Sequence, residues 1–272
     1  MDQHLAIRHV QVQTISWCNR SCAFCPSQKF EIERTQMPQS SYERILDELA
    51  SIGYTGRFSP YLNNESLLDK RLVRLVAMAR QRLPQSILFI ATNGDALSMQ
   101  RALDLFDAGL DRLSINCYDD DSGRVARLRA LAQQLCRSLP DVYYCESATF
   151  AEMVSRRAGE PVQRCVCLRD CTALRIEDMT NIAGNVPGAA VPPVPLALSC
   201  YRPFEQLHVR YNGEVVLCHC DWKGEVVFGN INQQSLPEIY NGEVARAYRE
   251  RLARGDRSGK LCSKCDFPGV LH

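Results

Sequence analysis

The sequence has almost no net charge and lacks a long hydrophobic run. Its 32 basic residues nearly balance 31 acidic residues, so the formal net charge is +1, and such a chain has no field that attracts nucleic acid or an anionic membrane. No apolar run approaches the roughly 20 residues that span a bilayer, and the amino terminus lacks the features of a secretory signal. We therefore expect a cytoplasmic protein that binds a neutral or small molecule, and neither nucleic acid nor membrane.

Internal repeats and low-complexity tails are also missing, whereas cysteine is abundant. A chain of 272 residues with a 46% hydrophobic share suits a barrel of roughly 200 residues plus a smaller unit. Fourteen cysteines in a chain without a secretory signal indicate metal or redox chemistry rather than disulfides.

Helical and extended patterns alternate along the first part of the chain. Apolar residues at helical spacing predict helices within 42–49, 72–83 and 125–135. Short β-prone runs predict strands at 10–17, 58–63, 86–92, 112–118 and 142–148. This alternation favours an α/β fold with parallel strands, either an open doubly wound sheet or a partial barrel, with the reactive groups at the carboxyl ends of the strands.

The pattern changes at about residue 180, so we expect one domain over 1–180 and a second over 181–272. A stretch rich in proline, glycine and alanine comes first. Asn212 and Gly213 then separate two β-prone runs, which is a strong signal for a two-residue hairpin. A helix is expected from about Leu236 to Leu252, ahead of Cys262 and Cys265.

Three cysteines follow the first predicted strand with the spacing C-x3-C-x2-C, at Cys18, Cys22 and Cys25. Three thiolates can hold three corners of a [4Fe–4S] cluster and leave one iron open, whereas electron-transfer ferredoxins use four cysteines. A three-thiolate zinc site or a loose group of thiols is the alternative, because the spacing alone does not distinguish iron from zinc.

With Phe24 directly before the last cysteine, this motif resembles the signature of radical S-adenosylmethionine (SAM) enzymes. The resemblance implies a partial (β/α)6 barrel whose open iron binds the amino and carboxylate groups of SAM. The cluster then cleaves SAM to a 5′-deoxyadenosyl radical, which removes a hydrogen atom from the substrate. An external electron donor such as flavodoxin or ferredoxin is implied as well.

The same resemblance implies a SAM site built from the ends of the next strands. Asn63, Asn64 and Glu65 occupy the place of a Gly-Gly-Glu-like turn that binds the SAM amino group. Further SAM or substrate contacts are implied at the rim of the barrel by Thr92, Asn93, Ser114 and Asn116. The alternative for these residues is a local role, because Asn93 precedes glycine in a turn-like sequence and Ser114 is an ordinary polar strand residue.

A second resemblance covers the last third of the chain, which is similar to the SPASM/twitch extension of some radical SAM enzymes. It implies one auxiliary [4Fe–4S] cluster, the second cluster of the protein, held by Cys200, Cys218, Cys262 and Cys265. A structural zinc site that uses Cys220 or His219 is the alternative. Cys165 and Cys167 fit neither cluster.

Together the resemblances imply a radical SAM oxidoreductase or epimerase. It would abstract a carbinol hydrogen from a small sugar or aminocyclitol in antibiotic biosynthesis, as aminoglycoside-type dehydrogenases and epimerases do. Epimerisation needs a hydrogen donor, for which Cys117, Cys145 and Cys171 are candidates. Related sequences often carry arginine at the position of Ile182, which weakens the dehydrogenase interpretation. A peptide-modifying radical SAM enzyme and a zinc-bearing binding module remain alternatives.

Overall fold

Nine strands form one sheet in the computed structural model, which describes residues 6–30, 33–118, 121–146, 162–172 and 175–269. The strands are β1 (His9–Val12), β2 (Arg57–Ser59), β3 (Ile87–Thr92), β4 (Arg112–Cys117), β5 (Val142–Glu146), β6 (Arg164–Asp170), β7 (Gln206–Val209), β8 (Glu214–Val216) and β9 (Val227–Asn230). Their order is β5-β6-β4-β3-β2-β1-β7-β8-β9, and β1 to β7 run parallel. The predicted α/β class with parallel strands is confirmed.

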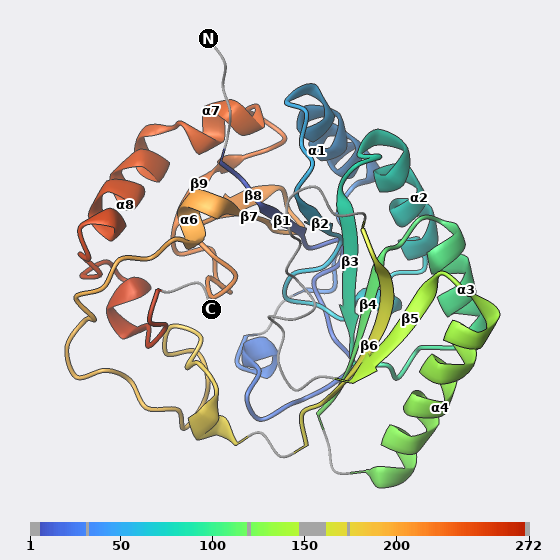
Figure 1. The fold of residues 1–272 in the computed structure, drawn as a ribbon. Helices are drawn as coiled ribbons and strands as arrows, with labels where there is room; N and C mark the ends of the chain where they lie inside the picture. The colour runs from blue at the N-terminus through green and yellow to red at the C-terminus, as the bar shows by residue number, and fades with distance from the viewer. Residues whose placement is uncertain (1–5, 31–32, 119–120, 147–161, 173–174, 270–272) are drawn as a thin grey trace.

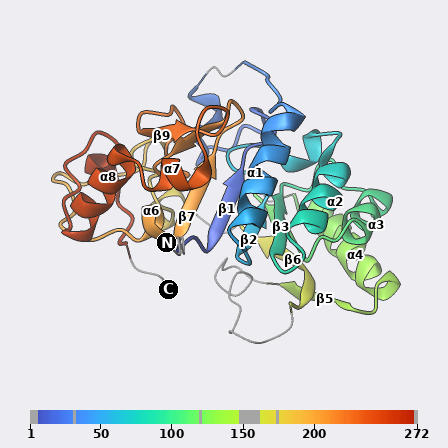
Figure 2. The same cartoon turned by 90° about the horizontal axis from the view of Figure 1, so that it is seen from above.

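Four long helices follow strands of the first part and pack along one side of the sheet, and α7 packs beside α1 on that side (Figures 1 and 2). The helices are α1 (Gln39–Ser51), α2 (Leu72–Arg82), α3 (Met99–Asp107), α4 (Ser122–Ser138), α6 (Arg202–Glu205), α7 (Leu236–Tyr240) and α8 (Glu243–Ala253). Short 3-10 turns are η1 (Pro26–Gln28), η2 (Ser66–Leu68), η3 (Ile176–Asp178) and η4 (Cys262–Lys264). Among the described residues, no helix is long and apolar enough to cross a membrane.

The main hydrophobic core lies between the sheet and α1 to α4. Alternate residues of each strand enter it, such as Leu88 and Ile90 of β3 and Leu113 and Ile115 of β4. Since strand side chains alternate between faces, the residues between them point to the opposite side of the sheet. We call that side the concave face; Phe89, with its neighbours in a separate small cluster, lies there.

A hairpin of β7 and β8 is confirmed and extends the sheet, but the predicted two-residue turn is wrong. The N–H of Arg210 donates to the carbonyl oxygen of Glu214, so the loop contains Tyr211, Asn212 and Gly213. Gly213 adopts φ +86°, and a Cβ atom at this position would lie 2.4 Å from Nδ2 of Asn232, so the turn requires glycine. Strand β7 of this hairpin pairs in parallel with β1, where His208 is the register partner of Gln11. The sheet therefore continues without a gap from the first part of the chain into the last third.

Several predicted element bounds are wrong. Strand β1 ends at Val12, and β2 ends before Pro60, which has no N–H to continue a ladder. The predicted helix 236–252 is two helices, because the chain breaks at Asn241 and Gly242. Helix α3 and strand β6 were not predicted, and β6 lies between β4 and β5 in the sheet.

Candidate active site

The first cysteine motif lies on a loop that leaves the carboxyl end of β1; we call residues 18–25 the cysteine loop. Its last turn is closed by the N–H of Cys25, which donates to the carbonyl oxygen of Cys22 at 3.0 Å. Cys18, Cys22 and Cys25 carry thiols of intermediate exposure. Burial raises the pKa of the Cys18 thiol, so an adjacent metal cation would be needed to hold it as a thiolate.

Asp95, two residues after Asn93 at the end of β3, anchors this loop. Its carboxylate accepts hydrogen bonds from Nδ2 of Asn19 at 3.0 Å and from the Arg20 guanidinium at 2.6 and 2.7 Å. Arg124, in the first turn of α4, forms a second ion pair with it at 3.1 Å. Burial alone would raise the pKa of Asp95, but the two guanidinium groups outweigh it and hold that pKa below its usual value. Sequence patterns did not identify Asp95.

Glu65 occupies the centre of the rim, where β2 and β3 end. Its buried carboxylate accepts three hydrogen bonds: from Oγ1 of Thr92 at 2.6 Å, from the N–H of Asn93 at 2.7 Å and from the N–H of Leu67 at 3.0 Å. Glu65 thus fixes the predicted SAM-contact segments to one another. Asn93 in turn reaches the cysteine loop, with Nδ2 at 2.9 Å from Oδ1 of Asn19 and 3.9 Å from Sγ of Cys18.

Asn63 and Asn64 lie beside Glu65 with different partners. The Asn63 amide donates to the carbonyl oxygen of His219 at 3.2 Å, which connects the rim to the last third of the chain. The Asn64 Oδ1 accepts from the N–H of Leu62 at 3.0 Å, while its buried Nδ2 has no hydrogen-bond partner among the described residues. An unpartnered buried donor at this rim suits a polar ligand.

Near the carboxyl ends of β4 and β6, the concave face carries polar side chains. Ser114 donates to Oδ1 of Asn116 at 2.9 Å on β4, and Arg169 of β6 lies 3.5 Å from the same oxygen. Phe24 from the cysteine loop packs on Tyr118, with ring centroids 5.0 Å apart. The structure therefore brings Phe24, Ser114 and Asn116 to one side of the sheet, as predicted for a ligand-binding rim.

The candidate donor thiols separate into different environments. The prediction that Cys117 faces the barrel interior is wrong: it is fully buried in the main core among the helices. Cys145 lies on the concave face and is the register partner of Cys167. Cys171 follows the end of β6 and lies near Tyr118. Cys165 and Cys167, which no motif explained, face the same side as Cys145.

Four cysteines of the last third line one small cavity, which we call the auxiliary cavity. They are Cys200, Cys218, Cys262 and Cys265, and the cavity wall also contains Ala183, Arg202, Leu217, Leu252, Arg257 and Leu261. Segments 60 residues apart in the sequence thus converge on one point. The four residues are those implied by the resemblance to the twitch extension.

The chemistry of this cavity fits an iron–sulfur cluster. Burial raises the pKa of Cys200 and Cys265, and burial with the neighbouring thiols raises the pKa of Cys262 to about 12. Such thiols become ligands only beside strong positive charge, which cluster irons supply. In the described parts of the chain, no three His, Cys, Asp or Glu side chains gather closely enough for a single metal ion. The four thiols surround a space instead.

The segment 181–185 joins the two cysteine sites. Lys29, four residues after Cys25, donates to the carbonyl oxygens of Gly184 at 3.3 Å and Asn185 at 3.5 Å. The Asn185 side-chain amide donates to the backbone carbonyl oxygen of Cys220 at 3.0 Å. Ile182 adopts φ +48°, a strained conformation for a β-branched residue. Its side chain packs against the auxiliary cavity.

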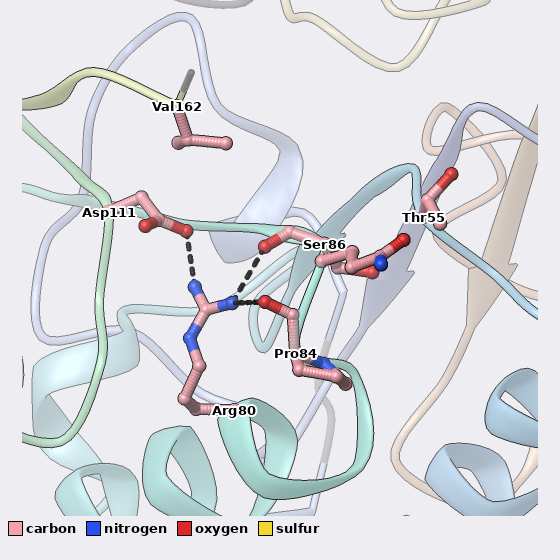
Figure 3. A pocket seen from close by; sticks show the side chains of 7 residues that line it. Thr55, Arg80, Pro84, Ser86, Asp111 and Val162 are labelled. Carbon is pink, nitrogen blue, oxygen red and sulfur yellow. Dashed lines mark hydrogen bonds and ion pairs between the residues drawn. The ribbon is translucent and has the colours of Figure 1, made fainter.

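A surface hollow lies at the opposite, amino-terminal end of the strands (Figure 3). There Arg80 of α2 donates to the carbonyl oxygens of Pro84 at 2.8 Å and Ser86 at 3.0 Å and pairs with Asp111. All these contacts tie the end of α2 to β3 and β4. Because ligands of parallel sheets bind at the carboxyl ends of the strands, this hollow is a structural junction.

Two family models match the chain. Residues 12–129 match the model described as the radical SAM superfamily, and residues 200–266 match SPASM, an iron–sulfur cluster-binding domain. These ranges contain the cysteine loop and the auxiliary cavity respectively.

Among curated proteins, the S-adenosyl-L-methionine-dependent 2-deoxy-scyllo-inosamine dehydrogenase of Niallia circulans is 26% identical over 263 residues, covering 96% of this chain and 93% of the relative. The GTP 3′,8-cyclase of Synechococcus sp. (strain CC9902) is 34% identical over 117 residues, covering 42% of this chain and 33% of the relative.

Solved structures agree with the fold. The crystal structure of BtrN in complex with AdoMet and 2-DOIA matches with a TM-score of 0.76 and 25% identity, covering 96% of this chain and 93% of that chain. The structure of anSMEcpe with bound AdoMet matches with a TM-score of 0.57 and 12% identity, covering 94% and 85%. The second likeness concerns the fold alone.

Proposed function

Because the chain belongs to the radical SAM superfamily and carries a SPASM domain, we propose that it oxidises a carbinol carbon of an aminocyclitol-type substrate. The observation that carries this proposal is similarity over 96% of the chain to an aminocyclitol dehydrogenase. The auxiliary cavity supports it, since oxidation needs an acceptor for the second electron and an iron–sulfur cluster can accept one. We further infer a cytoplasmic location and a flavodoxin- or ferredoxin-type electron donor.

The first site is assigned as follows. Cys18, Cys22 and Cys25 hold one [4Fe–4S] cluster, and Asp95 keeps their loop in place. SAM occupies the rim that Glu65 organises, in contact with Asn63, Asn64, Thr92, Asn93 and Phe24. When bound, the cluster and SAM supply the hydrogen-abstracting radical chemistry.

The substrate is placed on the concave face of the sheet. Ser114 and Asn116 offer hydroxyl and amide groups to substrate hydroxyls, and the Arg169 guanidinium beside Asn116 orients them. Phe24 and Tyr118 close the site against water by ring packing. Cys200, Cys218, Cys262 and Cys265 are assigned to the auxiliary [4Fe–4S] cluster.

Metal content tests the cluster assignments. The protein is purified and reconstituted without oxygen, and iron, sulfide and zinc are measured in the parent and in a Cys18/Cys22/Cys25 triple alanine variant. We expect about eight irons per chain falling to about four. About four irons with one zinc would make the auxiliary cavity structural, and zinc alone would contradict the radical mechanism.

Product analysis tests the reaction. The reconstituted protein is incubated with SAM, a reductant and 2-deoxy-scyllo-inosamine in deuterated water. Oxidation yields 5′-deoxyadenosine and a ketone that lacks two hydrogen atoms. Failure of the triple alanine variant to form 5′-deoxyadenosine is the matched control.

Epimerisation is the second candidate, because the Cys145 thiol lies on the concave face. An epimerised product keeps its hydrogen count and gains solvent deuterium. In that case Cys145→Ala would spare formation of 5′-deoxyadenosine but abolish the deuterated product. If the parent protein forms a ketone and Cys145→Ala forms the same ketone, epimerisation is excluded.

A further inference from the structure

Two arginines lie buried in the wall of the auxiliary cavity. Arg202 is 8% exposed and Arg257 is 3% exposed, and both line the same space as the four thiols. A guanidinium is charged at any physiological pH, and burying a charge is unfavourable unless an opposite charge accompanies it. The two buried guanidinium groups therefore need a negatively charged group close by.

No carboxylate meets that need for Arg202 among the residues that the structure describes. Its guanidinium donates to Sγ of Cys220 at 3.4 Å and lies 3.6 Å from the centre of the Phe267 ring. One contact is a thiol and the other an aromatic face, so neither neutralises the charge. The guanidinium is held firmly beside the thiols of the cavity.

Arg257 shows the same lack of a carboxylate within the described chain. It donates to the carbonyl oxygens of Leu198 and Ser199, each at 2.7 Å, and to that of Phe267. These bonds fix the backbone just before Cys200, so Arg257 also has a structural role. Arg202 makes fewer such bonds and is the better residue to test.

We propose that Arg202 and Arg257 supply fixed positive charge that raises the reduction potential of the auxiliary cluster. Four thiolates give a [4Fe–4S] cluster net negative charge, and reduction adds one more negative charge. Cations held close by in a poorly hydrated cavity favour the more negative state. The two arginines thereby make the cluster an electron acceptor.

This inference rests on the proposed function. In the oxidation, the carbinol gives one hydrogen atom to the radical derived from SAM, one proton to water and one electron to the auxiliary cluster, and becomes a ketone. The charges of Arg202 and Arg257 favour that last transfer.

The test measures the reduction potential directly. In the Cys18/Cys22/Cys25 triple alanine background only the auxiliary cluster remains, and its potential is read by electron paramagnetic resonance during a redox titration. We expect Arg202→Gln to lower the equilibrium constant for reduction at least tenfold, a shift of 59 mV for one electron. Arg202→Lys, which keeps the charge, should stay close to the parent.

Arg249→Gln is the matched control. Arg249 is 9% exposed and its guanidinium stacks on Tyr240, so its loss removes a buried cation of the same region outside the cavity wall. The reduction potential of the auxiliary cluster in Arg249→Gln should equal that in the triple alanine parent. If Arg202→Gln does not retain four irons, Arg202→Met, which keeps apolar contact with Phe267, replaces it.

The outcomes separate the two proposals. An unchanged potential in Arg202→Gln, or an equal shift in Arg202→Lys, overturns the role of the charge while leaving the cluster in place. A triple alanine background that binds zinc or no metal overturns the assignment of the auxiliary ligands, and the inference falls with it.

Discussion

At the scale of single residues, the site depends on side chains with unusual hydrogen-bonding demands. Glu65 accepts hydrogen bonds from three donors at once, whereas His208 is fully buried and neither of its ring nitrogens has a partner within the described part of the chain. The first arrangement locks two strand ends together. The second arrangement leaves the ring nitrogens of His208 buried, with the centroid of its ring 5.7 Å from that of the His219 ring.

Replacing Glu65 by glutamine should weaken both the fold and SAM cleavage. The amide would oppose at least one of the donors from Thr92, Asn93 and Leu67, because its nitrogen cannot accept a hydrogen bond. We expect a loss of about 1–3 kcal/mol in the free energy of unfolding, measured by urea denaturation without oxygen. Unchanged stability would show that the three hydrogen bonds do not brace the rim.

The buried histidines predict that stability falls in mild acid. Burial, followed by the charge of Arg57, lowers the pKa of His9, and burial followed by His219 lowers that of His208. The unfolded chain binds these protons near pH 6.5 while the folded chain does not, so stability is complete above pH 6.5 and declines below it. Below pH 6.5, each of these histidines lowers the free energy of unfolding by about 1.4 kcal/mol per pH unit.

Urea denaturation at pH 7.5, 6.5 and 5.5 measures this decline. His208→Leu removes one titrating group, so its stability should fall less steeply between pH 6.5 and 5.5 than that of the parent. Parallel curves for the two proteins would contradict the assignment.

At the scale of elements, strand ends carry the site and helices hold them in place. The cysteine loop follows β1, Glu65 follows β2 and Asp95 follows β3, while Arg124 reaches Asp95 from the first turn of α4. The loop itself contains little regular structure. Its position therefore depends on the hydrogen bonds between the loop and its neighbours Asp95 and Asn93.

Asp95→Asn should loosen the cysteine loop more than it destabilises the protein. The half-buried pairs with Arg20 and Arg124 contribute about 1 kcal/mol at most, yet they anchor the loop that carries the first cluster. We expect a chelator to remove about four irons faster from Asp95→Asn than from the parent protein, and absorbance measures this rate. Asp47→Asn, which removes the more exposed pair with Arg82, should leave that rate unchanged.

Sequence patterns predicted elements well where the apolar period was long and poorly where it was short or carried cysteine. Strand β6 was not predicted, because two of its residues are cysteines, which are buried there as small apolar residues. Asn241 and Gly242 break a helix whose apolar period continues across them. The motif cysteines were predictable from local spacing, but Asp95 and Arg202 act through contacts between distant segments that no local pattern records.

At the scale of the whole molecule, the two cysteine sites share one frame. Strand β7 continues the sheet beside β1, and Lys29 reaches segment 181–185, whose Ala183 lines the auxiliary cavity. The two cysteine sites are thus connected to each other through the sheet and through segment 181–185. Loading either cluster should order the segment between them.

Hydrogen exchange tests that coupling. Removing the clusters should raise exchange in the cysteine loop, in 181–185 and around Cys218, because bound metal stabilises the state that binds it. Strands β3 and β4, fully packed against the helices, should remain protected. A uniform rise across the chain would show that the clusters support the whole fold instead.

The pairing of β7 with β1 has a consequence for any attempt to divide the molecule. Cutting the chain before Gln206 would turn β1 from an interior strand into an edge, and the backbone groups of His9–Val12 that now pair with Gln206–Val209 would become open. Open edges recruit other strands. The severed first part would therefore self-associate, and grafting this SPASM unit onto another barrel requires a recipient that lacks a strand at the same edge.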